Sequence, residues 1–376
     1  MRIVLLGASG NAGREIARLL SPSLGAGDQL VLAGRDPGRL AATAAVVSGP
    51  AAVLIEQVDA TVDEEVRRLV AGATLVVVTA SVPERIGALA RMVAEAGADW
   101  MDTLLSSPAK LAALRALEPE LRANGCCFVT DGGFHPGLPA AMVRWAGGRL
   151  DDLETADVYG GMRLDWRAET LAGSTVAEML HEFDHFDLVT WIDGTNRKLK
   201  MSECPKVDFG PPIGAKTCVP MPLAEMDLLP KLYPTLNRSG FYIAGFSPAM
   251  DYVALPILMA MLKVPALHPL AARFTRWSFR RLASYPPPHR MVLRLDATGL
   301  LDGSPATASI EVAGDDGYFM TAAPVVACLR RLLDGSVRLP GLWLQAHVVP
   351  AETYFADLAD LGLAVTTELR TTRTAD

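Results

Sequence analysis

The sequence predicts an α/β protein: an N-terminal Rossmann domain with a doubly wound parallel sheet, followed by a second α+β substrate domain. Apolar runs alternate with stretches of helical spacing over the first 150 of the 376 residues, and a glycine-rich turn follows the first run. Beyond Leu150 the sequence becomes less regular and richer in Pro and Gly. We expect a dinucleotide-binding domain at 1–149, a substrate domain at 150–317 and a segment at 318–376 that packs back on the first domain.

Six apolar runs, rich in β-branched residues, predict the strands of the first sheet. They are nearly continuous rather than alternating, as parallel strands covered by helices on both faces require. The runs are 3–6, 30–33, 52–58, 74–79, 100–103 and 126–130. The stretches of helical spacing between them are 12–20, 63–70, 84–96 and 108–124. This alternation favours βαβ units.

The second domain carries two hairpin signals, Asp-Gly pairs at 193–194 and 302–303. Alternating strands are expected at 291–297 and 306–312, around the second pair. Residues 251–282 have helical spacing broken by prolines, and a last helix is predicted at 318–333, before a Pro340-Gly341 turn.

The bulk composition excludes several classes of protein. The formal net charge is −7 and the basic residues form no long run, so we expect no nucleic-acid partner. The apolar stretch 253–262 is too short to span a bilayer, and we assign it to a core, with an interfacial role as the alternative. The five cysteines show no metal-ligand spacing, which favours reduced thiols and a cytoplasmic protein.

The first turn has the spacing of a dinucleotide-binding loop. A strand here must turn sharply into a helix, and glycines let the backbone approach a pyrophosphate with no Cβ in the way. The free N–H groups of the following helix then face the phosphates. The predicted binding residues of this loop are Gly7, Ser9, Gly10, Asn11, Ala12 and Gly13.

The second strand predicts the choice of cofactor. NAD-binding domains place an acidic residue at its end, whereas here Gly34 and Arg35 stand there. A guanidinium would pair with a 2′-phosphate, so NADP is favoured, and NAD is the alternative if Asp36 binds the ribose diol. Asp59, at the end of the third strand, is expected beside the adenine or as a helix N-cap.

The end of the fourth strand completes the expected cofactor site. By the rule that ligands bind outside the carboxyl ends of parallel strands, Ala80, Ser81 and Val82 would lie under the nicotinamide half.

Three motifs together resemble the saccharopine dehydrogenase-like (saccharopine reductase-like) superfamily. They are the loop 7–13, Ala33-Gly34-Arg35, and the run Gly132-Gly133-Phe134-His135-Pro136-Gly137-Leu138-Pro139, and the C-terminal run from Tyr318 to Gly362 is similar too. The resemblance implies a Rossmann domain, a second α+β domain that carries substrate and often dimer contacts, and hydride transfer with NAD(P)H. The superfamily more often has Asp where His135 stands.

Candidate catalytic residues follow from position and chemistry. His135 lies in a glycine-kinked loop after the sixth strand, facing the expected nicotinamide, and a helix should start near Pro136 or Leu138. Asp102 ends the fifth strand and would bind substrate or ribose, or cap the helix that begins at 106–108. Tyr159, expected at a strand end in the second domain, is a further proton donor.

Two features of the region after Leu164 also have alternative interpretations. Ser174, after Gly173, would bind an anion or cap the helix expected at 176–186. His181 and His185 lie four residues apart, which would suit a metal, but we expect a solvated helix face and no metal site.

The leading hypothesis is an NADP-dependent oxidoreductase that transfers a hydride to or from a small imine, amino acid or carbonyl compound. The alternatives are an NADP-linked enoyl reductase of acyl or isoprenoid chains, which the apolar stretch 253–270 would suit, and a non-catalytic NADP-binding sensor. We expect the second domain to set the substrate, a small molecule, and the protein to be a homodimer without an integral membrane span.

Overall fold

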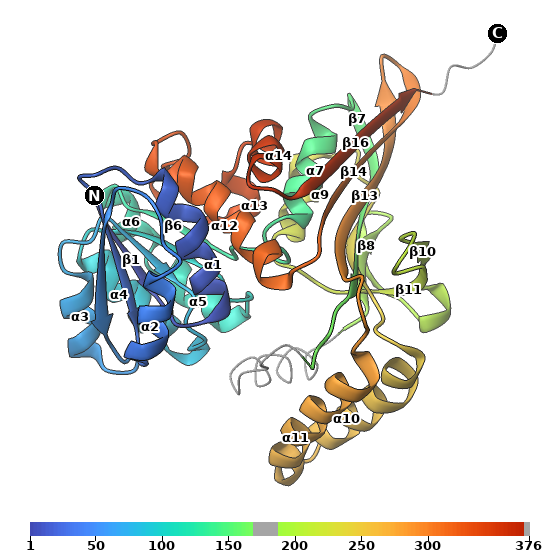
Figure 1. Ribbon diagram of the computed structural model, residues 1–376. Helices are drawn as coiled ribbons and strands as arrows, with labels where there is room; N and C mark the ends of the chain where they lie inside the picture. Colours follow the sequence, from blue (N-terminus) through green and yellow to red (C-terminus); the bar gives the residue numbers. More distant parts are fainter. Residues whose placement is uncertain (168–186, 372–376) are drawn as a thin grey trace. The chain divides into compact units, whose positions relative to one another are not determined.

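The computed structural model describes residues 1–167 and 187–371 and shows two compact units (Figure 1). The first unit contains Met1–Ala141 and Tyr318–Leu363. The second contains the described residues of Met142–Gly317 and of Ala364–Asp376. Each unit is built on one β-sheet.

The sheet of the first unit is parallel throughout and has, in the described residues, the order β15-β6-β5-β4-β1-β2-β3. Its strands are β1 (Arg2–Leu6), β2 (Gln29–Gly34), β3 (Ala52–Gln57), β4 (Leu75–Val78), β5 (Asp99–Asp102), β6 (Cys127–Thr130) and β15 (Gly341–Leu344). The chain moves outward from β1 to β3, returns to β4 beside β1, and then moves outward the other way. The gap between β1 and β4 is therefore the topological switch point, where such sheets bind ligands. This doubly wound sheet confirms the predicted fold class.

Helices cover this sheet. They are α1 (Asn11–Leu20), α2 (Pro37–Ala44), α3 (Asp63–Val70), α4 (Ile86–Glu95), α5 (Pro108–Arg115), α6 (Glu118–Asn124), α12 (Gly317–Leu333), α13 (Gln345–Val348) and α14 (Ala351–Asp360), with α7 (Pro139–Gly147) crossing the boundary between the units in sequence. On one sheet face, Val4, Val76 and Trp100 share a buried core with Leu69 of α3 and Leu89 of α4. The central strands are thus fully buried, as their unbroken apolar sequence predicts.

Two details of this unit differ from the sequence prediction. The helix expected at 108–124 is split into α5 and α6, because Pro119 has no N–H to donate and is tolerated only in the first turn of a helix. β3 is an edge strand with exposed Leu54 and Ile55, whereas its apolar sequence predicts cover on both faces.

The second unit contains a mixed sheet of nine strands within the described residues. Its main path is β10-β11-β12-β7-β13-β14-β16, and β8 and β9 branch from β12. The strands are β7 (Asp152–Arg163), β8 (Val189–Ile192), β9 (Thr195–Lys198), β10 (Lys206–Asp208), β11 (Ala215–Pro220), β12 (Arg238–Ala244), β13 (Arg290–Leu301), β14 (Ser304–Gly314) and β16 (Ala364–Thr371). The short helix α9 (Leu229–Leu232) precedes β12.

Both predicted hairpins form. Asp193 and Gly194 have φ of 52° and 74°, and Asp302 and Gly303 have 51° and 72°. Two successive positive φ angles are typical of a type I′ turn, which matches the twist of the flanking strands. These turns connect β8 to β9 and β13 to β14.

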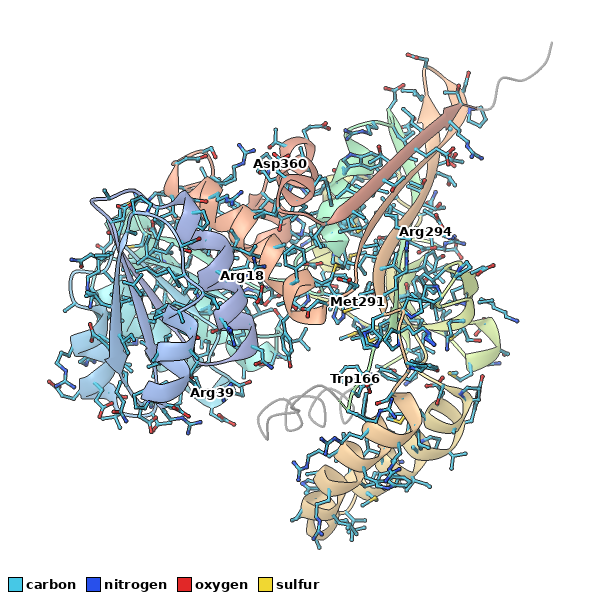
Figure 2. The ribbon with its side chains drawn as sticks, viewed as in Figure 1. Arg18, Arg39, Trp166, Met291, Arg294 and Asp360 are labelled. Atoms are coloured by element: carbon cyan, nitrogen blue, oxygen red, sulfur yellow. The ribbon has the colours of Figure 1, made fainter. Side chains whose placement is uncertain are left out.

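The proline-rich segment between β12 and β13 forms α10 (Leu255–Leu262) and α11 (His268–Ser278), which run side by side (Figure 1). A π-helical turn precedes α10 at Met250–Ala254, and another follows α11 at Phe279–Ala283. Phe279 anchors this segment to Trp166, which is labelled in Figure 2, with ring centroids 5.2 Å apart. No helix among residues 1–167 and 187–371 is long and apolar enough to cross a membrane.

The C-terminal segment is divided between the units. Residues 318–363 lie in the first unit, where β15 pairs with β6. Residues 364–371 instead form β16, which pairs antiparallel with β14 of the second sheet. The expectation of one segment packing on the Rossmann domain from 318 to 376 therefore does not hold for β16. The backbone of the outer strand β14 is paired along most of its length by this addition.

Candidate functional site

The glycine loop joins β1 to α1 at the switch point. Gly7 has a φ of +100°, and a Cβ on it would lie 2.5 Å from the backbone nitrogen of Ala80. A Cβ on Gly13 would lie 2.5 Å from the carbonyl oxygen of Gly7. Glycine is therefore required at both positions for the loop to pack between the ends of β1 and β4.

The N-terminus of α1 is suited to an anion. Its N-cap is Gly10, which has no side chain to cap the helix, and no acidic residue lies in the first turn. The first hydrogen bond of the helix runs from Arg14 N to Gly10 O, so the N–H groups of Asn11, Ala12 and Gly13 have no helix carbonyl to bond. The positive end of the helix dipole adds to their attraction for a phosphate.

The end of β2 lies directly beside this loop. A Cβ on Gly34 would be 2.9 Å from the Ser9 Oγ, so a larger residue here would require the Ser9 side chain to move. Arg35, the next residue, is exposed. Asp36 caps α2, since its Oδ1 accepts a 3.0 Å hydrogen bond from Arg39 N. Its carboxylate is thus committed to the helix, whereas Arg35 is exposed beside it.

Asp59 follows β3 and is half-buried. Its Oδ1 accepts hydrogen bonds from Thr61 N at 2.9 Å and Thr61 Oγ1 at 2.8 Å. These two bonds, and more weakly the charge of Arg35, lower the pKa of the carboxyl below its ordinary value. Asp59 closes the turn before α3, whose N-cap is Val62, so the predicted helix cap at Asp59 is wrong.

The end of β4 forms the other wall of the switch point. Thr79 N donates to Leu6 O at 2.9 Å, which continues the ladder between β4 and β1. Ala80, Ser81 and Val82 follow and are all half-buried. Since Ala80 N lies against Gly7, the structure brings these residues to the glycine loop.

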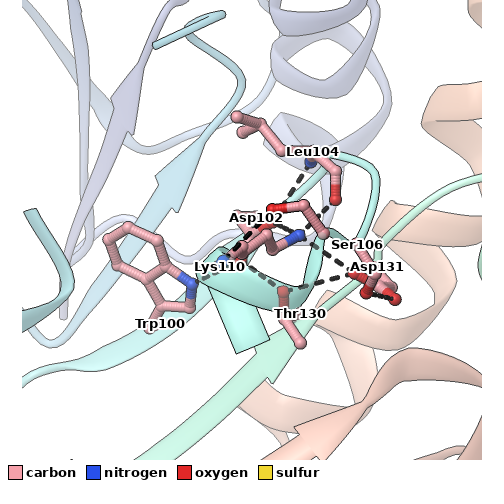
Figure 3. Close-up of polar contacts among 8 residues, drawn as sticks. Trp100, Asp102, Leu104, Ser106, Lys110, Thr130 and Asp131 are labelled. Atoms are coloured by element: carbon pink, nitrogen blue, oxygen red, sulfur yellow. Dashed lines mark hydrogen bonds and ion pairs between the residues drawn. The ribbon is translucent and has the colours of Figure 1, made fainter. Parts of the chain in front are cut away.

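A buried polar network occupies the carboxyl ends of β5 and β6 (Figure 3). Lys110 Nζ, on α5, lies 2.7 Å from Asp102 Oδ1 and 2.9 Å from Asp131 Oδ1. Ser106 Oγ donates to Asp131, and Lys110 Nζ also donates to the Leu104 carbonyl. All three charged side chains are buried.

Asp102 has a full set of protein partners. Beside Lys110 it accepts hydrogen bonds from Trp100 Nε1 at 2.9 Å, Thr130 Oγ1 at 2.7 Å and Leu104 N at 3.1 Å. It is completely buried among these partners, which hold the ends of β5 and β6 together. The predicted alternative, a helix cap by Asp102, is wrong: Ser107 caps α5 by accepting from Lys110 N.

The charges in this network influence one another. Burial raises the pKa of Asp131, and Lys110 and Ser106 only partly offset that effect. Burial alone would lower the pKa of Lys110, but the two carboxylates overcome it and raise the value. An ammonium between two carboxylates is the arrangement that keeps these buried charges compensated.

The loop after β6 starts from this network. Asp131 has a φ of 59° and Gly132 N donates to Asp102 O at 2.9 Å. Gln345 of α13 donates to Gly133 O at 3.2 Å, which holds the loop from the other side. The helix α7 starts at Pro139, a little later than the predicted Pro136 or Leu138, because Gly137 still has a φ of +123°.

His135 lies in this loop and is half-buried. Its ring lies 4.8 Å from that of Phe134, measured between centroids. Burial lowers the pKa of His135 to about 4, so its imidazole is neutral at pH 7. A neutral imidazole can accept a proton or form a hydrogen bond, but it does not carry a proton to deliver.

Tyr159 belongs to the second unit and lies within β7, which continues to Arg163 instead of ending at Tyr159-Gly160-Gly161 as expected. The side chain is buried, stacks on Tyr242 at 5.4 Å, and its hydroxyl donates to Asp157 at 3.5 Å. Burial and the nearby Asp157 raise the pKa of Tyr159. In this unit it is a core residue of the sheet face.

Three residues that hold the ends of β5 and β6 and the loop after β6 were not identified from the sequence. They are Lys110, Asp131 and Gln345. Asp131 had a signal, since an Asp before a glycine pair suits a positive φ, but nothing near Lys110 indicates buried partners.

No group of described residues has the geometry of a metal site, and Ser174, His181 and His185 lie outside the described residues.

Comparison with known proteins agrees with this geometry. Residues 3–129 match the family described as "Saccharopine dehydrogenase NADP binding domain". No curated protein matches the chain. A solved structure, apo saccharopine dehydrogenase (L-Glu forming) from Saccharomyces cerevisiae, is similar over 98% of this chain and 99% of its own, with a TM-score of 0.71 and 15% identity. The C. glutamicum DAP dehydrogenase in complex with DAP covers 93% and 94%, with a TM-score of 0.47 and 14% identity.

The matched region ends with β6, so it contains the glycine loop, Arg35 and the ends of β4 and β5. The prediction of NADP as cofactor is confirmed by this match. The cradle of Gly7 and Gly13 and the uncapped N-terminus of α1 fit the pyrophosphate of that cofactor. Residues 3–129 are thus similar to the NADP-binding domain of saccharopine dehydrogenase, the chain shares the fold of that enzyme, and the matched domain supports an NADP-dependent oxidoreductase.

Proposed function

We propose that this oxidoreductase acts on a small imine, amino acid or carbonyl compound. The observation that carries the proposal is the placement of His135 in a loop that starts where β6 ends, in the same unit and at the same sheet edge as the glycine loop. The substrate class follows the matched domain, which is that of saccharopine dehydrogenase. NADP, when bound, accepts or supplies the hydride.

Residues of the first unit have separate roles in binding NADP and in positioning His135. The first turn of α1 binds the pyrophosphate, and Arg35 pairs with the 2′-phosphate. Ala80, Ser81 and Val82 form the wall beneath the nicotinamide half. Asp102, Lys110 and Asp131 hold the ends of β5 and β6, which fixes the start of the His135 loop.

His135 is the proposed catalytic group. Because its imidazole is neutral at pH 7, it suits an acceptor for the proton of a substrate amine, or a hydrogen-bonding anchor for a carbonyl or imine. This refines the sequence-based hypothesis of a proton donor. Since its pKa is about 4, the His135 imidazole becomes protonated, and can no longer accept a proton, only as the pH falls through that value.

The experiment is a screen of NADPH oxidation and NADP reduction over amines with keto acids, carbonyl compounds and enoyl compounds. His135→Asn should lower turnover by about 10²-fold while NADPH affinity is unchanged. The acid limb of the wild-type pH profile should also disappear in this variant. His289→Asn is the control, since His289 lies in the second unit and bonds the Tyr285 carbonyl.

Three outcomes would count against the proposal. Wild-type turnover by His135→Asn would make this residue structural. Turnover of enoyl compounds alone would indicate a C=C reductase. NADPH binding without turnover of any compound would indicate a sensor.

A further inference from the structure

The pair α10 and α11 exposes large apolar side chains to an unusual degree. Six of the fifteen exposed large hydrophobic side chains in the described residues lie between 252 and 277. Tyr252 is 67% exposed, Leu270 53% and Trp277 52%. Scattered single apolar residues are normal on a surface, but a cluster marks a binding surface.

These side chains are not needed for the core of the pair. Buried positions recur every four residues on the inner face of this segment, at Met250, Ala254, Leu258 and Leu262. They pack in small clusters with Ala271 and Phe279 from the α11 side. The exposed apolar side chains between 252 and 277 therefore form a second apolar face that points outward. A helix that is buried on one side only does not need such a face.

The outward faces have helical spacing. Val253, Ile257 and Val264 follow one another at four and seven residues, so they share a face along α10 and its flanks. On α11, Leu270, Arg273 and Trp277 are three and four residues apart, and Arg281 follows after four more. Apolar and cationic side chains are thus interleaved on one face.

The charge of this segment is one-sided. Residues 252–283 contain Lys263, Arg273, Arg276, Arg280 and Arg281 and no Asp or Glu, although the whole chain has a net charge of −7. Lys263, Arg273, Arg280 and Arg281 are exposed. None of the five makes an ion pair with another residue in 1–167 or 187–371, whereas Arg290 and Arg294, just beyond, pair with Glu311 and Asp296.

We propose that the outward face of residues 252–281, here called the helical-pair surface, docks on an anionic lipid membrane. Exposed Trp, Tyr and aliphatic side chains together with exposed cations are the chemistry of an interfacial helix. A second copy of the same surface would bring like charges together, which disfavours a symmetric dimer here. Nucleic acid would use the cations but leave Val253, Ile257 and Leu270 in water.

The lengths of the helices agree with docking rather than insertion. α10 has 8 residues and α11 has 11, which corresponds to roughly 12 and 17 Å of helix. A bilayer core is about 30 Å thick, so neither helix reaches across it. They would lie in the plane of the interface, with Trp277 and Tyr252 at the headgroup level.

The test is flotation of the full-length protein with vesicles of phosphatidylcholine alone, or of equal parts of phosphatidylcholine and phosphatidylglycerol. The protein should float with the anionic vesicles only, less so as salt is raised, and Trp emission should shift to the blue. Each cation near an anionic surface contributes about fivefold in partitioning, so the triple variant Arg273→Gln, Arg280→Gln, Arg281→Gln should bind roughly a hundredfold more weakly.

A second variant tests the apolar part. Tyr252→Ser, Ile257→Ser and Trp277→Ser together should weaken binding by about tenfold or more without loss of fold, because all three are exposed. The matched controls change exposed residues elsewhere and should bind as wild type does. They are Arg68→Gln, Arg91→Gln and Arg115→Gln for charge, and Leu54→Ser, Ile55→Ser and Leu228→Ser for apolarity.

The proposal is overturned if the wild type does not float with anionic vesicles, or if the charge variant and its control bind equally. It is also overturned if the apolar variant changes the sedimentation mass of the protein while vesicle binding is absent, because the surface would then be a contact between copies. None of these readouts uses enzyme activity, so they stand apart from the proposed reaction.

Discussion

At the scale of single residues, the glycines of the cofactor loop differ in what they do. Gly7 and Gly13 are required by protein packing, since a Cβ on either would collide with backbone. Gly10 is less crowded, with its nearest neighbour, Gly7 O, 3.2 Å from a Cβ. The spacing of glycines in a sequence does not distinguish these cases, because the clash at Gly7 involves Ala80, which follows another strand, β4.

Arg35 should determine the preference for NADPH over NADH. A charge-assisted hydrogen bond to phosphate is worth roughly 1.5–3 kcal/mol, and about 1.4 kcal/mol is tenfold in affinity. Arg35→Ala should therefore weaken NADPH binding by about tenfold to a hundredfold and leave NADH nearly unchanged. Titration of both cofactors into both proteins checks this, and equal wild-type affinity for the two would contradict it.

Lys110 should be essential for stability. Its removal leaves two buried carboxylates without their cation, and breaking a buried ion pair in this way costs about 3–5 kcal/mol. Lys110→Met should lose this amount in denaturant unfolding, whereas the exposed Lys231→Met should not.

The pH dependence of Lys110→Met identifies the cause. Without the ammonium, the pKa of Asp131, already raised by burial, rises further in the folded state. The folded variant then holds protons that the unfolded chain releases, so its stability falls as the pH rises above about 3.9, the ordinary value for Asp. Adding Asp131→Asn should restore part of the lost stability, and no restoration would refute the electrostatic explanation.

At the scale of elements, the sequence analysis misread the N-cap and proline signals that mark where helices start. The sequence analysis missed α2, although Asp36 followed by Pro37 is a helix start, with an N-cap and a proline in the first turn. The same Asp36 was weighed only as a ribose ligand. Conversely, the stretch 108–124 was predicted as one helix because its spacing is regular, and Pro119 divides it.

Asp36 therefore has a structural effect that can be measured. Loss of a side-chain N-cap costs about 1 kcal/mol, so Asp36→Ala should lower the free energy of unfolding by that amount while Asp36→Asn largely preserves it. NADPH affinity should remain near that of the wild type in both. If Asp36→Ala instead weakens cofactor binding without loss of stability, the carboxylate belongs to the ribose site.

At the scale of the whole molecule, each sheet recruits a strand from the end of the chain. β15 adds to the first sheet beside β6, and β16 adds to the second sheet beside β14. The four residues of β15 follow a Pro-Gly turn and are too few to carry a periodic signal, so they were not predicted as a strand. The homodimer and the cytoplasmic location remain predictions.

The sequence by itself determined the doubly wound sheet, the glycine loop, both Asp-Gly hairpins and NADP as the cofactor. Each of these depends on neighbours in the chain: unbroken apolar runs, a strand that turns into a helix, an Asp-Gly pair. Only the tertiary structure decided that Lys110 lies between Asp102 and Asp131, that Gln345 supports the His135 loop, and that Tyr159 is a core residue. These contacts join residues of different strands and helices, and a buried charge is marked by its partners rather than by its own sequence neighbours.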